Sequence, residues 1–521
     1  LVWAAAACSG AADAPPDVSD LVTRAEATAY RETSRYDDVM TFLRTLAERD
    51  PRVHLTSMGT TSEGRDMPLV VVGADGATPT AVRATGKLVV YLQGNIHGGE
   101  VPGKEALQML LRDWVAGRTP DWTDRLVLLV NPIYNADGNE KVALDNRPLQ
   151  YGPVGGMGQR PNAQGYDLNR DHMKLDTPEA RAFVSLLNAY DPQVTLDLHT
   201  TDGTRHGYLL TYAPSLHPDT DPALDSLARE ALLPDVRARI LERYGWHAYD
   251  YGNAFQPRGA EERGWYTFDH RPRFNNNYVG LRNRLAILSE AYAYATFEDR
   301  VRATRQFVDE VLDWVHDHAD QVRAAVQAAE ARRVAGRALT TRSTFERSPE
   351  PVEILMGAVD TVPHPETGAP MLLRVDTLIP VRMPEFVRFR ASETETAPAA
   401  YLLPGDLLEP LSLIEAHGLV TRRLTDDVRL EVERFTIDST RAAERPFQGH
   451  NERTVWGRWS AVDTTLPRGT VVVETAQPLG KLAFHLLEPR ADDGLVDWGL
   501  MDLYLRPGHA FPVLRTRSRV P

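Results

Sequence analysis

Short apolar runs alternate with helical patterns through the first 335 residues, and this alternation restricts the fold more than any other feature of the chain. The apolar run at 88–92 predicts a buried strand, and a helical pattern follows it from 101 to about 115. Further strands are predicted at 53–58, 68–72, 126–130, 194–199, 207–211 and 285–290, and further helices at 20–50, 178–190, 221–244 and 299–335. Strands that alternate with helices predict an α/β fold with a mixed, largely parallel sheet flanked by helices.

The pattern changes after about residue 336. Helical periodicity fades, and β-branched runs separated by Pro and Gly follow, as at 428–437 and 470–475, with one short helix expected at 406–417. We therefore predict a catalytic domain over 20–336 and a smaller β-rich domain over 337–521. The second domain shows no catalytic group of residues, and its role is open.

The N-terminal residues 1–19 contain the only cysteine, Cys8. Four alanines precede Cys8, which resembles the end of a bacterial lipoprotein signal, and a Pro-containing tether follows it. An ordinary signal tail with an incidental cysteine is the alternative. Both interpretations predict an exported protein, either periplasmic or anchored to the membrane through a lipid on Cys8, and a chain with one cysteine forms no internal disulfide.

The overall charge narrows the range of partners. The net charge is −14, whereas phosphate backbones and anionic lipids bind basic surfaces. A nucleic-acid partner is therefore not expected. No internal apolar run approaches the ~20 residues needed to cross a bilayer.

Three reactive side chains lie at or just past the C-terminal ends of predicted strands. His97 comes just after the strand at 88–92, His199 ends the strand at 194–199, and Glu290 ends the strand at 285–290. In open α/β sheets, ligands bind at the edge formed by the carboxyl ends of the strands. Each residue alone is a weak signal, but together they predict a site at that edge.

The residue types at this edge suit a zinc ion. His97 and Glu100 lie three residues apart on a glycine-rich bend, and His199 is the best distant third ligand. A catalytic zinc needs three protein ligands and an open position for water. A carboxylate that is not a ligand must accept the proton of that water, and Glu290 is the candidate.

The ordered set His97-x-x-Glu100, Asp167-Leu168-Asn169-Arg170, His199 and Glu290 resembles the M14 family of zinc carboxypeptidases over residues 20–335. The resemblance implies one Zn²⁺ per chain, bound by His97, Glu100 and His199. It also implies that Glu290 is the general base and acid.

The same resemblance implies roles for the residues around the metal. Asn169 and Arg170 would hold the terminal carboxylate of the substrate, and Asp167 would bind the free ring nitrogen of His97. Arg160 would stabilise the developing oxyanion, with Arg147 as the weaker alternative. For the mobile active-site tyrosine of the family, Tyr278 is favoured over Tyr266.

The chain departs from the family pattern at two places. Gly98 and Gly99 separate the near pair of ligands, where many relatives carry a charged residue, and Asp171 follows Arg170, where Asn is frequent. An acid beside Arg170 would weaken the preference for an anionic C-terminus, so the substrate stays open.

The leading expectation is a metallocarboxypeptidase that hydrolyses the C-terminal bond of peptides with a free carboxylate, by a zinc-activated water and Glu290. An amide deacylase or a cell-wall peptide hydrolase would use the same site. A non-catalytic binding protein on an inactive peptidase fold is a third alternative, and the intact ligand set with Glu290 argues against it.

Overall fold

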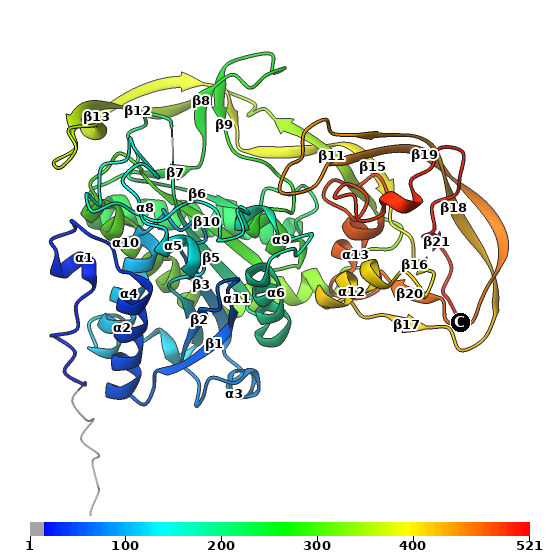
Figure 1. Ribbon diagram of the computed structural model, residues 1–521, viewed down its shortest axis with the longest axis horizontal. Coiled ribbons are helices and arrows are strands. Elements are labelled where there is room, and N and C mark those ends of the chain that lie inside the picture. Colours follow the sequence, from blue (N-terminus) through cyan, green and yellow to red (C-terminus); the bar gives the residue numbers. More distant parts are fainter. Residues whose placement is uncertain (1–14, 202) are drawn as a thin grey trace, which may run out of the picture.

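The computed structural model describes residues 15–201 and 203–521 (Figure 1). The proposed lipid-anchor residue Cys8 lies outside the described residues. No helix in the described part of the chain has the length and apolar character needed to cross a membrane.

The first part of the chain is built on an eight-stranded mixed sheet with the strand order β1-β2-β4-β3-β5-β10-β6-β7. These strands are β1 (His54–Thr60), β2 (Asp66–Val72), β3 (Leu88–Gly94), β4 (Leu126–Asn131), β5 (Val194–Thr200), β6 (Leu210–Pro214), β7 (Ala248–Asp250) and β10 (Leu285–Ala291). The central strands β4, β3, β5 and β10 run parallel to one another. The predicted α/β class with a largely parallel sheet is confirmed.

Helices cover both faces of this sheet (Figure 1). The helices α2 (Tyr36–Arg49), α4 (Pro102–Val115), α8 (Leu233–Tyr244) and α10 (Phe297–Asp317) share one hydrophobic cluster with the sheet, and α6 (Pro178–Tyr190) and α9 (Asn275–Leu281) share another. Successive side chains of a strand point to opposite faces, so Val90 joins the first cluster and Tyr91 the second. Burial on both faces explains the unbroken apolar runs of the central strands.

Two predicted helices are interrupted. The helix expected at 20–50 is α1 (Arg24–Ala27) followed by α2, because Ala29 and Tyr30 have φ values of 49° and 58°, which no helix continues through. The helix expected at 299–335 is α10 followed by α11 (Ala319–Ala331). Between them His318 has φ −112°, and its Nδ1 lies 2.8 Å from the carbonyl oxygen of Trp314.

The C-terminal region is rich in β-structure from β11 (Ala338–Glu346) onward, as predicted. A six-stranded sheet has the order β17-β20-β16-β21-β18-β19. Its elements are β16 (Ala400–Leu403), β17 (Arg422–Arg423), β18 (Val428–Ala442), β19 (Arg453–Leu466), β20 (Val471–Glu474) and β21 (Leu514–Thr516), with α12 (Leu408–Ala416) and α13 (Gly480–Leu487). Phe183 of α6 and Phe484 of α13 belong to one buried cluster, so the two parts of the chain share a core. The domain boundary at 336 stays a prediction.

A long hairpin connects the C-terminal region to the catalytic part. It consists of β12 (Val352–Pro363) and β13 (Pro370–Met383) and extends over the edge of the catalytic sheet (Figure 1). The following strand β14 (Glu385–Phe386) pairs with β9 (Gly264–Tyr266), which also pairs with β8 (Asn253–Phe255). The next strand, β15 (Arg388–Thr396), pairs with β11 in a separate two-stranded sheet.

Candidate metal centre and substrate pocket

The loop between β3 and α4 carries His97 and Glu100. Its two glycines are required by close approach, because a Cβ on Gly98 would lie 2.3 Å from the carbonyl carbon of Gly138 and one on Gly99 would lie 2.5 Å from the carbonyl oxygen of Gly158. Any larger residue would push these backbones apart. The glycines that depart from the family pattern therefore follow from how this loop packs.

Three side chains converge at the end of the central strands. Ligand atoms of His97, Glu100 and His199 all lie within 4.8 Å of one another. The Nδ1 atoms of His97 and His199 lie 2.9 Å from Glu100 Oε1 and Oε2, respectively. Two imidazoles and one carboxylate form a donor set that suits a catalytic zinc.

The outer ring nitrogens of both histidines contact carboxylates. His97 Nε2 lies 3.0 Å from Asp167 Oδ1, and His199 Nε2 lies 2.8 Å from Asp197 Oδ2. With a metal bound, donation from Nε2 to these carboxylates would leave the lone pair of each Nδ1 free for the metal, which is the arrangement that metal-binding histidines need. The residues present therefore fit a zinc ion.

Charge also favours a metal at this position. Burial raises the pKa of Glu100, but the neighbouring His97 and Arg147 charges and the hydrogen bonds from both histidines outweigh burial and hold this pKa well below its ordinary value. The carboxylate is thus ionised, as a metal ligand must be.

Glu290 lies beside this centre because of strand register. In the parallel pair of β5 and β10, Glu290 is the partner of His199. Both side chains line one pocket of ~250 Å³. The pocket is lined by His97, Glu100, Arg147, Arg160, Asn169, Arg170, His199, Thr200, Thr201, Tyr251, Phe268, Phe274, Leu288 and Glu290.

Asp167 is the N-cap residue of the turn η2 (Leu168–Arg170) and contacts side chains that line the pocket. Its Oδ1 accepts the backbone N–H of Asn169 at 3.0 Å, and its Oδ2 lies 2.8 Å from Nη2 of Arg160. The neighbouring His97 holds the pKa of Asp167 well below its ordinary value although burial raises it. One carboxylate therefore orients a candidate metal ligand, a candidate oxyanion-binding cation and the start of the Asn169–Arg170 pair.

Asn169 and Arg170 are fixed by the segment before α9. Asn169 Oδ1 accepts the backbone N–H of Asn275 at 2.8 Å, and the Arg170 guanidinium lies 3.9 Å above the ring centre of Phe274. Asp171 is turned away, because its carboxylate accepts from Lys174 Nζ at 2.6 Å and from the N–H of Thr177 at 2.8 Å. The expected weakening of anion binding by Asp171 is therefore not supported.

Both candidate arginines reach the metal position. Arg147 forms an ion pair with Glu100 Oε1, and Arg160 Nη1 lies 3.5 Å from the same oxygen. Arg147 Nε lies 3.2 Å from the position of a Cβ on Gly99, so its side chain fills the space that a larger residue at 99 would use. The positively charged side chain of Arg147 therefore lies where a side chain at position 99 would otherwise lie.

The structure places both candidates for the mobile tyrosine outside the metal pocket, so the choice of Tyr278 stays a prediction. The Tyr278 hydroxyl is buried and lies 2.7 Å from Nδ1 of His417, and the Tyr266 hydroxyl donates to the carbonyl oxygen of Glu262 at 2.9 Å. Among the described residues, neither tyrosine lines the pocket, whereas Tyr251, between β7 and β8, does. The sequence offered no signal for Tyr251, because its position depends on a connection between two three-residue strands.

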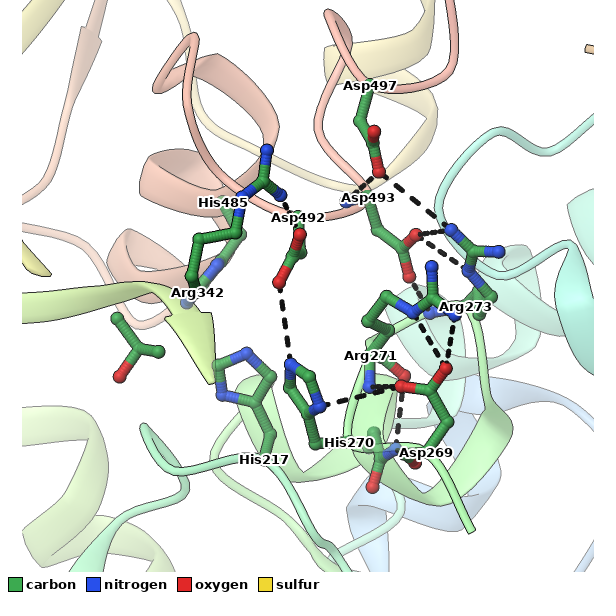
Figure 2. A network of polar contacts seen from close by, with 12 residues as sticks. His217, Asp269, His270, Arg271, Arg273, Arg342, His485, Asp492, Asp493 and Asp497 are labelled. Carbon is green, nitrogen blue, oxygen red and sulfur yellow. Dashed lines mark hydrogen bonds and ion pairs between the residues drawn. The ribbon is translucent and has the colours of Figure 1, made fainter. Parts of the chain in front are cut away.

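The C-terminal region supports this site from outside. Arg273, one residue before Phe274, donates through Nε to Asp493 Oδ1 at 2.7 Å, and its backbone N–H donates to Asp493 Oδ2 at 2.7 Å (Figure 2). Gln448 Oε1 accepts the backbone N–H of Asp167 at 2.8 Å. The two segments that carry the Asn169–Arg170 pair and its partners are therefore held by residues of the C-terminal region.

Comparison with known proteins agrees with this geometry. The family model for zinc carboxypeptidase matches residues 39–269. The chain is 24% identical over 477 residues to Carboxypeptidase 2 of Trichophyton tonsurans, which covers 87% of this chain and 81% of that protein. It is 28% identical over 198 residues to Carboxypeptidase D of Anas platyrhynchos, covering 36% of this chain and 13% of that protein.

Solved structures with a partial likeness include a metallo-carboxypeptidase from Burkholderia cenocepacia, with a TM-score of 0.40 and 19% identity over 55% of this chain and 70% of that one. Carboxypeptidase A from Helicoverpa armigera has a TM-score of 0.40 and 18% identity over 58% of this chain and 75% of that one.

The matched part of the chain belongs to the M14 family of zinc carboxypeptidases. The chain is a metallocarboxypeptidase, and hence a hydrolase.

Proposed function

We propose that this protein is an exported, zinc-dependent carboxypeptidase that removes residues from the free C-terminus of peptides. One observation carries the proposal: the Asn169–Arg170 pair lines the same pocket as Glu290 and the three candidate zinc ligands. A site that holds a terminal carboxylate beside a hydrolytic centre suits the last peptide bond of a chain. Export, to the periplasm or to a lipid anchor on Cys8, rests on the N-terminal sequence.

His97, Glu100 and His199 would hold the zinc, which when bound supplies a Lewis acid for hydrolysis. Glu290 accepts the proton of the attacking water and returns it to the leaving amine.

Arg160 and Arg147 provide positive charge near the carbonyl oxygen on which negative charge develops. Arg170 binds the terminal carboxylate through two parallel N–H groups, and Asn169 adds a further donor.

Arg170→Ala tests the recognition of the carboxylate. Hydrogen bonds to charged groups contribute roughly 1.5–3 kcal/mol, so kcat/KM for free-acid peptides is expected to fall about 10–100-fold, with little change on amidated peptides. The measurement is digestion of a peptide library, as free acids and as amides, followed by mass spectrometry with and without a chelator.

Arg429→Ala, which removes a cation whose side chain is 77% exposed, is the matched control. Equal loss on acids and amides would count against a carboxypeptidase. Full activity in chelator would count against zinc.

Asp197→Ala tests how His199 is oriented. Removal of the carboxylate that holds a metal-binding histidine commonly weakens metal affinity 10–100-fold, and we expect a loss in this range because Asp197 contacts His199 Nε2. Zinc affinity is measured by competition with a fluorescent chelator. Asp376→Ala, at a side chain that is 92% exposed, is the control, and unchanged affinity in Asp197→Ala would exclude this role.

A further inference from the structure

We propose that the C-terminal hairpin β12–β13, together with β14, shapes a second pocket that binds a bulky apolar residue on the N-terminal side of the cleaved bond. This inference rests on the proposed function, because it assigns the part of a peptide that the metal pocket does not hold.

The second pocket is large and mostly apolar. It is an open hollow of ~750 Å³, which is within the size range of small-molecule pockets. It is lined by Asn146, Arg147, Pro148, Leu149, Gln150, Arg160, Thr201, Gly203, Thr204, Asn253, Phe255, Ala293 and Tyr294. Leu149 and Phe255 are 45% and 44% exposed, and large apolar side chains this accessible at a pocket are candidates for ligand contact.

The two pockets meet beside the metal position. They share Arg147, Arg160 and Thr201, whereas Asn169 and Arg170 line the metal pocket alone. A peptide with its terminal carboxylate at Arg170 would therefore pass the metal ligands and continue past the two shared arginines into the large pocket. The residue before the cleaved bond is the first one able to enter it.

The hairpin holds two walls of the large pocket by backbone hydrogen bonds. The N–H of Leu372 donates to the carbonyl oxygen of Leu149 at 2.9 Å, and the N–H of Arg374 donates to that of Tyr294 at 2.6 Å. Leu149 and Tyr294 are therefore bound to the edge of β13 that does not pair with β12. Their position depends on where the hairpin lies.

The strands β12 and β14 support the other two walls of the large pocket, which are the segment after Thr204 and the strand β8. Next to Thr204, the N–H of Gly207 donates to the carbonyl oxygen of Leu355 in β12 at 2.8 Å. On the side of β8, the Phe255 ring packs at 5.6 Å on Tyr266, which stacks at 4.1 Å on Phe386 of β14. Four wall segments that are distant in sequence are therefore braced by the 352–386 segment. Figure 1 shows the hairpin extending over this side of the catalytic part.

The test measures binding without turnover. Zinc-loaded Glu290→Gln protein is titrated calorimetrically with two peptides, N-acetyl-Gly-Phe-Leu and N-acetyl-Gly-Gly-Leu. Burial of one aromatic side chain predicts about tenfold or tighter binding of the Phe peptide. Leu149→Asp, added to this protein, is expected to remove most of that preference, measured as the ratio of the two affinities, because a carboxylate replaces the apolar side chain that the Phe ring would contact.

Two further variants separate the hairpin from general effects. Leu372→Pro deletes the N–H that binds Leu149 and is expected to reduce the preference. Leu408→Asp changes a leucine that is 71% exposed on α12 and is expected to keep it. If Leu372→Pro does not fold, Leu149→Asp still decides the role of the pocket, and Arg374→Pro repeats the test of the hairpin at Tyr294.

The outcomes distinguish this inference from the proposed function. Equal affinity for the two peptides would overturn the second pocket even if the wild-type protein cleaves both. A preference that Leu149→Asp removes, without cleavage by the wild type, would support the pocket and contradict the proposed function. A preference that persists in both Leu372→Pro and Arg374→Pro would overturn the role of the hairpin.

Discussion

Glu290→Gln is expected to lower kcat about 10²–10⁴-fold, the range for loss of a general base, while the protein keeps its zinc. The register of β5 and β10 sets Glu290 beside His199, and the three-residue ligand set is complete without it. Glutamine has almost the same shape but accepts no proton at neutral pH. The measurement pairs kcat on a free-acid peptide with the zinc content of the purified protein.

The controls separate catalysis from metal binding. Glu298→Gln, at a glutamate that is 48% exposed on α10, should leave both quantities unchanged. Wild-type kcat in Glu290→Gln would remove the proposed role of this carboxylate. Loss of zinc would instead make Glu290 a ligand.

The edge of the sheet that carries the site was predictable from local sequence. Each central strand is an apolar run, and His199 and Glu290 each stand at the end of one. Parallel strands bring their carboxyl ends to one edge, so no detailed register was needed to expect these side chains together. Asp197 was also within reach, since residues two apart in a strand point to the same face.

The tyrosine was not predictable, because its position depends on distant partners. Tyr278 has a suitable place in the sequence, but its hydroxyl pairs with His417, 139 residues further on. Tyr251 lines the pocket from a short connection without periodicity. Local pattern does not determine which of two tyrosines points into a cavity.

The contribution of the C-terminal region was hidden for a related reason. The contacts of β13 with Leu149 and Tyr294 are made by backbone atoms, which every residue carries. Composition indicated a β-rich segment but not which other segments it would pair with. Such long-range pairing leaves little trace in a single sequence.

Asp493→Asn is expected to destabilise the protein by about 3 kcal/mol, near the lower end of the range for breaking a buried ion pair. Asp493 is 0% exposed and Arg273 is 2% exposed, so loss of the negative charge leaves a buried guanidinium with weaker compensation (Figure 2). Asn suits this test because Asp493 has φ 61°, which Asn also tolerates. The free energy of unfolding is measured by urea titration.

The same variant is expected to raise KM for free-acid peptides more than it lowers kcat. Arg273 leads into Phe274 and Asn275, which contact Arg170 and Asn169, respectively. A looser segment would thus disturb carboxylate binding before it disturbs Glu290. Asp463→Asn, at a surface ion pair whose carboxylate is 54% exposed, should change neither stability nor KM measurably.

Two results would contradict this account. If Asp493→Asn unfolds like Asp463→Asn, then Glu452, 2.6 Å from Arg273 Nη2, satisfies the guanidinium by itself. If stability falls while KM stays constant, the ion pair stabilises the fold but does not position the Asn169–Arg170 pair. Only a joint change in stability and KM supports the view that the C-terminal region, through Arg273, holds the carboxylate-binding end of the pocket.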